Sequence, residues 1–354
     1  MLRKLAAIIL AASLSLPMIS AADAAPKKDF KICWSIYVGW MPWGYLSDSG
    51  IMKKWAEKNG INVEITRIND YVESINQYTA GGFDGCSMTN MDALSIPAGG
   101  GVDTTALIIG DFSNGNDAVI LKDKTALADI AGQKVNLVEL SVSHYLLARA
   151  LDTVKLAEKD ITVVNTSDAD IVAAYGTSDV TSVVTWNPLV FEIVAMPGAH
   201  KVFDSAQIPG EIIDMMVVNT ETLKDNPALG KALVGAWYEV MELMTSDTPE
   251  GKAAKEEMAK ASGTDLAGFD AQLASTAMFY DPAKAVEFTN GAELPKTMDL
   301  VRNFLFSHGI LGTNATSVDV VGMSFPNGST LGDAKNVKLR FDPAFMAEAA
   351  TATP

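Results

Sequence analysis

The chain alternates between short apolar runs and segments with helical spacing. Residues 31–38, 61–68 and 83–88 are strand-like. The segments between them repeat apolar residues on one helical face and end at glycines. This alternation predicts a parallel sheet with helices on its faces.

The same alternation restarts after a boundary near residues 110–117. The strands predicted in this second unit are 135–138, 161–164, 180–185 and 215–219, with helices at 143–152 and 168–175. From residue 220 to about 308 the pattern is largely helical, and four prolines stand near the expected helix starts: Pro227, Pro249, Pro282 and Pro295. The tail from Ala347 is expected to be frayed.

These patterns predict an α/β protein of two lobes with mostly parallel sheets, two crossing strands and a helical C-terminal return. Lobe 1 comprises residues 25–112 and 218–354, and lobe 2 comprises residues 113–217. Ligands of open α/β sheets bind beyond the carboxyl ends of the strands. The loops that follow the strands are therefore the candidate site.

The N-terminal segment predicts export. Two basic residues precede an apolar run over residues 5–16 and a small-residue cleavage site at 22–24. The run is shorter than the roughly 20 apolar residues that span a bilayer. We therefore expect a signal peptide at 1–24 and a soluble periplasmic protein that does not span the membrane, without a cysteine at the cleavage site for a lipid anchor.

Composition and charge narrow the partners. The chain of 354 residues has a formal net charge of −16, which excludes nucleic acid, because its binding relies on basic residues. The chain has three histidines and two cysteines without a ligand cluster, so we expect neither metal nor cofactor. We expect a monomer with a small-molecule ligand.

The two cysteines lie in apolar, strand-like runs. A periplasmic protein can form a disulfide, but neighbouring strands lie about 4.8 Å apart, wider than the roughly 3.8 Å between the Cβ atoms of a disulfide. We expect Cys33 and Cys86 to be buried free thiols.

Tryptophans follow two of the predicted strands. Trp40 and Trp43 lie after the first strand, where they either pack in the core or form a stacking wall for a planar ligand. Trp186 ends the strand at 180–185 and is a candidate second wall. Asn187 is a candidate ligand contact too, although a cap of the helix that begins at Pro188 explains it fully.

Polar side chains gather after the third strand and at the first crossing. Thr89, Asn90 and Asp92 either bind a ligand or cap a helix and place a charge in its first turn. Asp111 lies where the chain crosses between lobes, in a segment whose composition also suits a hinge turn. All four are candidate ligand contacts.

The loops of the second lobe add further candidates. Ser141 is a natural helix N-cap, and a free helix N-terminus binds anions, but a carboxylate at Glu139 competes for that role. His144 is either a structural helix residue or a ligand contact. Asp214, at the second crossing, lies between Ile213 and Met215 and is hard to explain as a solvated charge.

With these residues assembled, the chain resembles the nitrate/taurine/sulfonate group of periplasmic solute-binding proteins. The segment at 33–43, CWSIYVGWMPW, looks like the subgroup of urea or guanidine binders associated with urea-carboxylase-type enzymes. The resemblance implies a type II-like two-lobed binding protein that closes like a flytrap, with an ABC transporter permease as its partner.

The resemblance also assigns individual residues. Residues 141–145 keep much of the group's Ser-His-Tyr segment, so Ser141 and His144 carry over as ligand contacts. Glu139 and the residue after it depart from that segment, which puts sulfonate or nitrate in doubt. Asp214 matches the position where taurine binders place an acid near the ligand's ammonium group.

The charge of the loops indicates the ligand. The four arginines of the mature chain and all its lysines lie outside these loops, which supply carboxylates and tryptophans instead. Carboxylates accept paired N–H bonds and indole faces stack on a planar cation. We expect guanidinium, with neutral urea or another small amide or amine as the alternative.

Two other classes of function are alternatives to a transport-binding protein. A pyrimidine-forming enzyme family of thiamine biosynthesis shares the fold, but its cysteine-rich motif is missing and we identify no catalytic residues. We therefore expect a binding protein and not an enzyme. A ligand-sensing receptor subunit is the remaining alternative, because the sequence does not distinguish a permease partner from a receptor partner.

Overall fold

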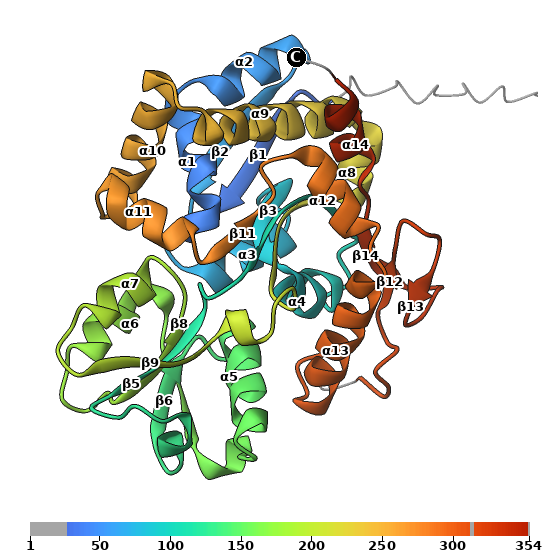
Figure 1. Ribbon diagram of the computed structural model, residues 1–354. Coiled ribbons are helices and arrows are strands. Elements are labelled where there is room, and N and C mark those ends of the chain that lie inside the picture. Colours follow the sequence, from blue (N-terminus) through green and yellow to red (C-terminus); the bar gives the residue numbers. More distant parts are fainter. Residues whose placement is uncertain (1–26, 312–314, 353–354) are drawn as a thin grey trace, which may run out of the picture.

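The computed structural model describes residues 27–311 and 315–352, and the predicted signal peptide at 1–24 lies outside them. The described chain forms two lobes, each built on one sheet (Figure 1). The prediction of a two-lobed α/β fold is confirmed.

Lobe 1 contains a nine-stranded sheet in the described part of the chain. Its order is β13-β12-β14-β4-β10-β3-β1-β2, and β11 pairs with β4. Its strands are β1 (Asp29–Trp34), β2 (Asn62–Arg67), β3 (Gly85–Thr89), β4 (Thr104–Ser113), β10 (Ile213–Asn219), β11 (Thr276–Met278), β12 (Gly322–Ser324), β13 (Thr330–Leu331) and β14 (Val337–Phe341).

Helices surround this sheet, and Figure 1 shows α2 and α9 side by side along the top of the lobe. The helices are α1 (Met41–Asp48), α2 (Ile51–Lys58), α3 (Tyr71–Thr79), α4 (Asn90–Ala93), α8 (Thr220–Asp225), α9 (Pro227–Thr245), α10 (Pro249–Ala261), α11 (Leu266–Leu273), α12 (Pro282–Thr289), α13 (Glu293–Ser307) and α14 (Ala344–Thr351). Short helical turns are η1 (Val38–Trp40) and η2 (Leu94–Ala98). Proline opens α9, α10 and α12, as the sequence predicts, because the first helical residue needs no N–H donor.

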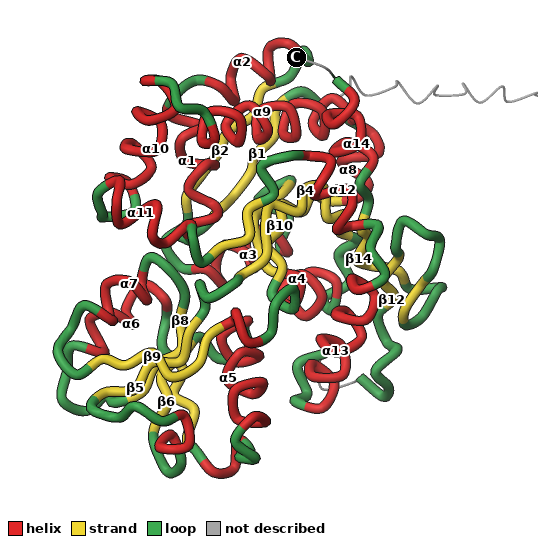
Figure 2. Tube along the Cα trace, in the orientation of Figure 1, coloured by secondary structure: helices red, strands yellow, loops and turns green. Residues whose placement is uncertain are grey.

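Lobe 2 is built on a five-stranded sheet of order β7-β6-β8-β5-β9. Its strands are β5 (Ala118–Lys122), β6 (Lys134–Leu137), β7 (Thr162–Asn165), β8 (Ser182–Thr185) and β9 (Ala199–Asp204). Its helices are α5 (Val142–Thr153), α6 (Asp168–Tyr175) and α7 (Leu189–Val194), with the short turns η3 (Leu127–Ile130), η4 (Glu158–Asp160) and η5 (Ser205–Gln207). Figure 2 places α6 and α7 on one side of these strands and α5 on the other.

The chain crosses between the lobes twice, after β4 and before β10. Because β10 brings the chain back into lobe 1, it lies between β3 and β4 and runs antiparallel to both. The returning strand makes the sheet of lobe 1 mixed, where the sequence predicts mostly parallel pairing. It also makes Asp214 the cross-strand partner of Asp111.

Cys33 and Cys86 form a disulfide between β1 and β3. The two residues are direct partners in the parallel register, with their Cα atoms 4.4 Å apart. The prediction of free thiols is wrong, because this separation lies within the range of about 4.4–6.8 Å that a disulfide bridges. The average spacing of neighbouring strands does not describe this close pair.

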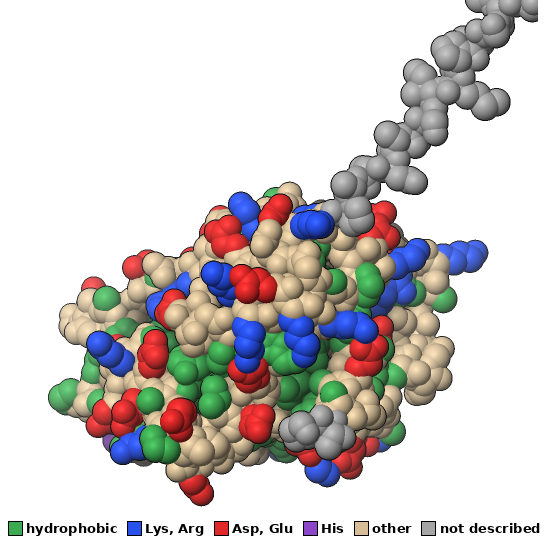
Figure 3. Space-filling model, turned by 90° about the horizontal axis from the view of Figure 1, so that it is seen from above, with side chains coloured by type: hydrophobic (Ala, Val, Ile, Leu, Met, Phe, Trp, Pro, Cys, Tyr) green, Lys and Arg blue, Asp and Glu red, His purple; other side chains and the backbone are tan. Residues whose placement is uncertain are grey.

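A surface groove opens on lobe 1. Figure 3 looks onto this face from above, where apolar side chains gather between lysines and carboxylates. The groove has a volume of about 1060 Å³ and is lined from α2, α9 and α14 by residues that include Trp55, Tyr238 and Phe345. None of the predicted site residues lines it.

Candidate functional site

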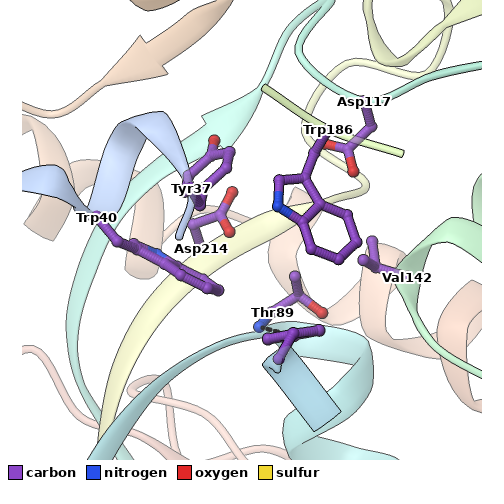
Figure 4. A pocket seen from close by; sticks show the side chains of 8 residues that line it. Tyr37, Trp40, Thr89, Asp117, Val142, Trp186 and Asp214 are labelled. Carbon is purple, nitrogen blue, oxygen red and sulfur yellow. Dashed lines mark hydrogen bonds between the residues drawn. The ribbon is translucent and has the colours of Figure 1, made fainter. Parts of the chain in front are cut away.

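A small pocket lies between the two lobes, and Figure 4 shows it with Trp40 and Trp186 on opposite sides. The space open to the centre of a water molecule is about 10 Å³, roughly the room that one water needs. The side chains that line the pocket are each at most 4% exposed: Tyr37, Trp40, Tyr71, Thr89, Asp117, Val142, Trp186 and Asp214. The closed arrangement therefore suits a very small ligand.

Four aromatic rings form a continuous wall. Tyr37 and Trp40 meet edge to face with ring centroids 5.0 Å apart, and Trp40 lies 5.7 Å from Tyr71. Tyr71 in turn meets Trp186, from the other lobe, at 5.5 Å. Ring faces carry partial negative charge and attract cations. The wall therefore favours a positively charged or planar ligand.

Carboxyl groups face this wall. Asp214, at the start of β10, lines the pocket, and Asp111 lies beside it on β4. The Tyr37 hydroxyl donates to Asp111 Oδ1 at 2.8 Å. Burial, followed by repulsion from Asp111, raises the pKa of Asp214 well above its ordinary value. Burial likewise raises the pKa of Asp111 to about 7.

A third carboxyl reaches the pocket from the first crossing. Asp117 lies between β4 and β5 and accepts a hydrogen bond from the Ser113 hydroxyl at 2.5 Å. Burial raises the pKa of Asp117 to about 7. In the part of the chain that the structure describes, no lysine, arginine or histidine lines the pocket. Its electrostatics are therefore acidic throughout.

Asp92 lies behind the pocket and accepts hydrogen bonds from two of the residues that line it. The Tyr71 hydroxyl donates to Asp92 Oδ2 at 2.6 Å, and the Thr89 hydroxyl donates to the same oxygen at 2.8 Å. Thr89 also caps α4, as the sequence predicts. Burial raises the pKa of Asp92 to about 6. Asp92 therefore fixes Tyr71 and Thr89 without lining the pocket itself.

Hydrogen bonds between the lobes close the pocket. The Trp186 indole N–H donates to the Ile36 carbonyl at 2.9 Å, and the Val38 amide donates to the Asn187 carbonyl at 3.1 Å. These bonds join the ends of β1 and β8. The ligand wall at Trp186 is thus held by the same contact that brings the lobes together.

Other predicted site residues have structural partners away from the pocket. Trp43 stacks on Trp237 in the core of lobe 1, with centroids 4.9 Å apart. The Asn90 side chain accepts from the Ile213 amide at 3.0 Å and so ties α4 to the start of β10. The Asn187 side chain accepts from the Phe191 amide at 3.0 Å, near the start of α7.

The candidates around α5 also lie outside the pocket. Glu139 is exposed. Ser141 caps α5 by accepting from the Ser143 amide at 3.2 Å. His144 contacts Glu158 at 3.0 Å. The structure thus brings Trp40, Trp186, Asp214 and Thr89 together, with Asp92 and Asp111 directly behind them, and leaves the α5 candidates apart.

Four lining residues were not among the predicted ones. Tyr37 follows the first strand, and Asp117 lies in the crossing after β4. Tyr71 opens α3, and Val142 opens α5 between two serines. All four lie at the ends of elements, on the ligand side of a sheet. This position is the feature of the sequence from which they could have been predicted.

The pattern of residues 34–262 matches the model of the NMT1-like family. The chain belongs to the NMT1-like family. No curated protein matches the sequence of this NMT1-like protein. Within its described residues, no helix has the length and apolar character needed to cross a bilayer, and no cluster of three or more His, Cys, Asp and Glu side chains is arranged to hold a metal ion.

Solved structures share the fold of this NMT1-like protein. The alkanesulfonate-binding protein SsuA of Xanthomonas axonopodis pv. citri is 14% identical with a TM-score of 0.68, covering 82% of this chain and 96% of its own. The aliphatic sulphonate-binding SsuA of Escherichia coli is 17% identical with a TM-score of 0.64, covering 81% and 94%.

The nitrate-binding protein NrtA of Synechocystis PCC 6803 is 14% identical with a TM-score of 0.58, covering 94% of this chain and 100% of its own. These three are periplasmic binding proteins, and a desulfurization enzyme is among the other matches. At these identities the likeness establishes the two-lobed binding-protein fold.

Proposed function

We propose that this protein binds guanidinium in the pocket between its lobes, as the periplasmic solute-binding component of an ABC importer. Membership of the NMT1-like family and the fold shared with sulfonate- and nitrate-binding proteins support the transport role. The predicted signal peptide agrees with it. The ligand is inferred from the pocket.

The observation that carries the ligand proposal is an acidic, aromatic pocket without a basic side chain among the residues that the structure describes. Sulfonate and nitrate require cations or free N–H groups, whereas this pocket presents Asp214 and Asp117. Burying a cation here compensates the buried carboxylates, and a desolvated cation–π contact contributes about 2 kcal/mol.

The shape of the pocket supports a small planar cation. Trp40 and Trp186 stand on opposite sides with Asp214 and Thr89 between them (Figure 4). Guanidinium presents flat faces to the indoles and in-plane N–H donors to a carboxylate. Because the closed pocket has room for roughly one water, the lobes have to separate slightly to hold guanidinium, and a larger ligand requires a wider separation.

Urea is the second candidate, and one observation favours it. Burial raises the pKa of both Asp111 and Asp214, and when one of these carboxyls is protonated it donates to a neutral carbonyl oxygen. Urea matches guanidinium in shape and differs in charge. The two compounds therefore form a matched pair for testing the charge argument.

Titration calorimetry with guanidinium, urea, taurine and nitrate tests the proposal. We expect guanidinium to bind most tightly and urea to bind more weakly. Taurine and nitrate should give no heat of binding. Tight binding of nitrate or taurine without a response to guanidinium overturns the proposal. Urea binding more tightly than guanidinium favours the second candidate.

A further inference from the structure

Asp111 and Asp214 form a buried pair of carboxyl groups. They are direct partners across β4 and β10, 0% and 3% exposed. Neither Asp111 Oδ2 nor Asp214 Oδ2 meets an N–H or O–H group among the described residues. Ionised carboxylates only accept hydrogen bonds. Side chains directly opposite each other in an antiparallel pair are neighbours, so the two carboxyls form a hydrogen bond with each other only when one of them is protonated.

The groups around the pair decide how firmly such a proton is held. Burial and the negative charge of Asp117 favour the protonated form, whereas the hydrogen bond that Tyr37 donates to Asp111 favours an ionised Asp111 and so directs a shared proton toward Asp214. Tyr280, which follows β11, is another titratable group close to the pair: burial, followed by the charge of Asp111, raises its pKa. Gly39 packs so closely that a Cβ at this position falls 2.6 Å from Asp111 Oδ2. No basic side chain of the described chain lines the pocket to stabilise two carboxylates.

The two carboxyls have different access to a ligand. Asp214 lines the pocket, whereas Asp111 is covered by Tyr37 and Gly39 and does not line it. A bound cation therefore contacts Asp214 directly and Asp111 only through Asp214. Asp111 is a positioning residue for the proton, and Asp214 is the ligand contact.

We infer that the pocket exchanges a proton for its cation, and that Asp111 makes this exchange possible by holding a shared proton with Asp214. This inference rests on the proposed function and adds a rule of specificity. When guanidinium binds, the O–H bond of the shared carboxyl proton breaks, the proton passes to solvent, and the carboxylate accepts N–H bonds from guanidinium. One positive charge enters and one leaves.

The exchange separates charged from neutral ligands. A cation displaces the proton, so its affinity rises with pH until the pair is fully ionised without ligand. A neutral ligand such as urea uses the protonated carboxyl as a donor and releases no proton. The carboxyl pair thus discriminates between ligands by their charge, whereas the aromatic wall discriminates between them by their shape.

Calorimetry of the full-length mature protein in buffers of different ionisation enthalpy tests the exchange. The change in measured enthalpy between buffers gives the number of protons released. At pH values below the ionisation of the pair we expect about one proton per guanidinium and none per urea. Guanidinium binding whose heat does not depend on the buffer overturns the exchange and leaves the proposed function standing. No guanidinium binding at any pH overturns the proposed function instead.

A variant locates the proton. In Asp111→Asn the repulsion from Asp111 is gone and the amide N–H donates to the Asp214 carboxylate, so Asp214 is less protonated and guanidinium binding releases fewer protons than in the wild type. Asp103→Asn is the matched control, because Asp103 precedes the other end of β4 and pairs with Arg340; its proton release equals that of the wild type. An Asp111→Asn protein that binds guanidinium and still releases the wild-type number of protons overturns the role of Asp111. If that variant does not fold, the wild-type proton count decides.

Discussion

At the scale of single residues, the site depends on carboxyl groups placed where water does not solvate them. Asp214 is 3% exposed and one of its oxygens has no hydrogen-bond donor in the described chain. An unpaired buried polar atom destabilises the fold. The cationic ligand that we propose supplies the missing donors, so its binding should stabilise the closed form.

Replacement of Asp214 by asparagine measures this contribution. Asp214→Asn keeps the shape of the side chain and removes the charge, so we expect guanidinium affinity to fall by about 2–5 kcal/mol, or roughly 30-fold to several thousand-fold. Calorimetry measures the change. Glu139→Gln removes an exposed carboxylate outside the pocket and serves as the control with unchanged affinity. Equal affinity of Asp214→Asn and wild type contradicts the assignment.

Sequence reasoning reached part of the site because loop position and residue chemistry are visible in the chain. Trp186 and Asp214 each follow or open a strand and lack a convincing local explanation, and both line the pocket. The sequence does not predict Tyr37 and Tyr71 as site residues, because core packing explains a tyrosine at the end of an element equally well. His144 is not among the residues that line the pocket, and its partner Glu158, 14 residues further along the chain, does not show in the local pattern.

At the scale of elements, the site is built where β4 leaves lobe 1 and β10 returns to it. The sequence predicts β10 from its apolar run, but the pairing of β10 with β3 and β4 depends on tertiary contacts. The short strands β12 and β13 near the C-terminus were not predicted, because two or three residues carry no readable period. The tail from Ala347 was expected to be frayed and instead forms most of α14, which packs against α9 and α12.

The disulfide between Cys33 and Cys86 links two elements of lobe 1, β1 and β3. Closing a loop between residues 53 apart in the sequence restricts the unfolded chain. We expect Cys33→Ser combined with Cys86→Ser to lower the free energy of unfolding by about 2–4 kcal/mol, measured by urea denaturation. Reductant should destabilise the wild type to a similar extent and leave the double variant unchanged. Alkylation of both thiols in unreduced, denatured wild type contradicts the bond.

At the scale of the whole molecule, contacts between the lobes extend well beyond the pocket. The end of α13 in lobe 1 reaches α5 in lobe 2, where Phe304 packs edge to face on Tyr145 with centroids 5.1 Å apart. Within lobe 2, the Arg149 guanidinium, on α5, donates at 2.8 and 2.9 Å to the carboxylate of Glu211, which lies just before β10, so this ion pair ties α5 to the second crossing segment. The lobes therefore contact each other at α13 and α5 as well as around the pocket.

A cluster of two histidines and one glutamate spans the outer contact. Glu158 accepts from His144 Nε2 at 3.0 Å and from His308 Nε2 at 2.8 Å. His144 Nδ1 accepts from the Leu140 amide, so the N–H of this ring lies on Nε2 and faces Glu158. His308 Nδ1 lies 2.8 Å from the Phe304 carbonyl oxygen. Both ring nitrogens of His308 face acceptors, so both carry protons and His308 is a cation.

This cluster predicts that closure weakens as pH rises. The Glu158 carboxylate raises the pKa of His308 above its ordinary value, so the stabilisation is complete below the ordinary pKa of histidine and is lost as pH rises through the raised one. Hydrogen bonds from His144 and His308 lower the pKa of Glu158 to about 2, so its contribution is complete above the ordinary pKa of glutamate and is lost as pH falls toward 2. The contact between the lobes is therefore strongest between the ordinary pKa values of glutamate and histidine, about pH 4.3 to 6.5.

Small-angle scattering of the unliganded protein at about pH 6 and about pH 9 measures this effect. We expect the radius of gyration of the wild type to increase with pH more than that of His308→Gln, which lacks the cation at both values. The comparison with the variant is needed because the buried carboxyls of the pocket also favour the closed form at low pH, where they are protonated. His200→Gln is the matched control, since His200 is exposed on β9 of lobe 2, and it should follow the wild type. A parallel response of wild type and His308→Gln assigns the pH dependence to the pocket carboxyls and removes His308 from the control of closure.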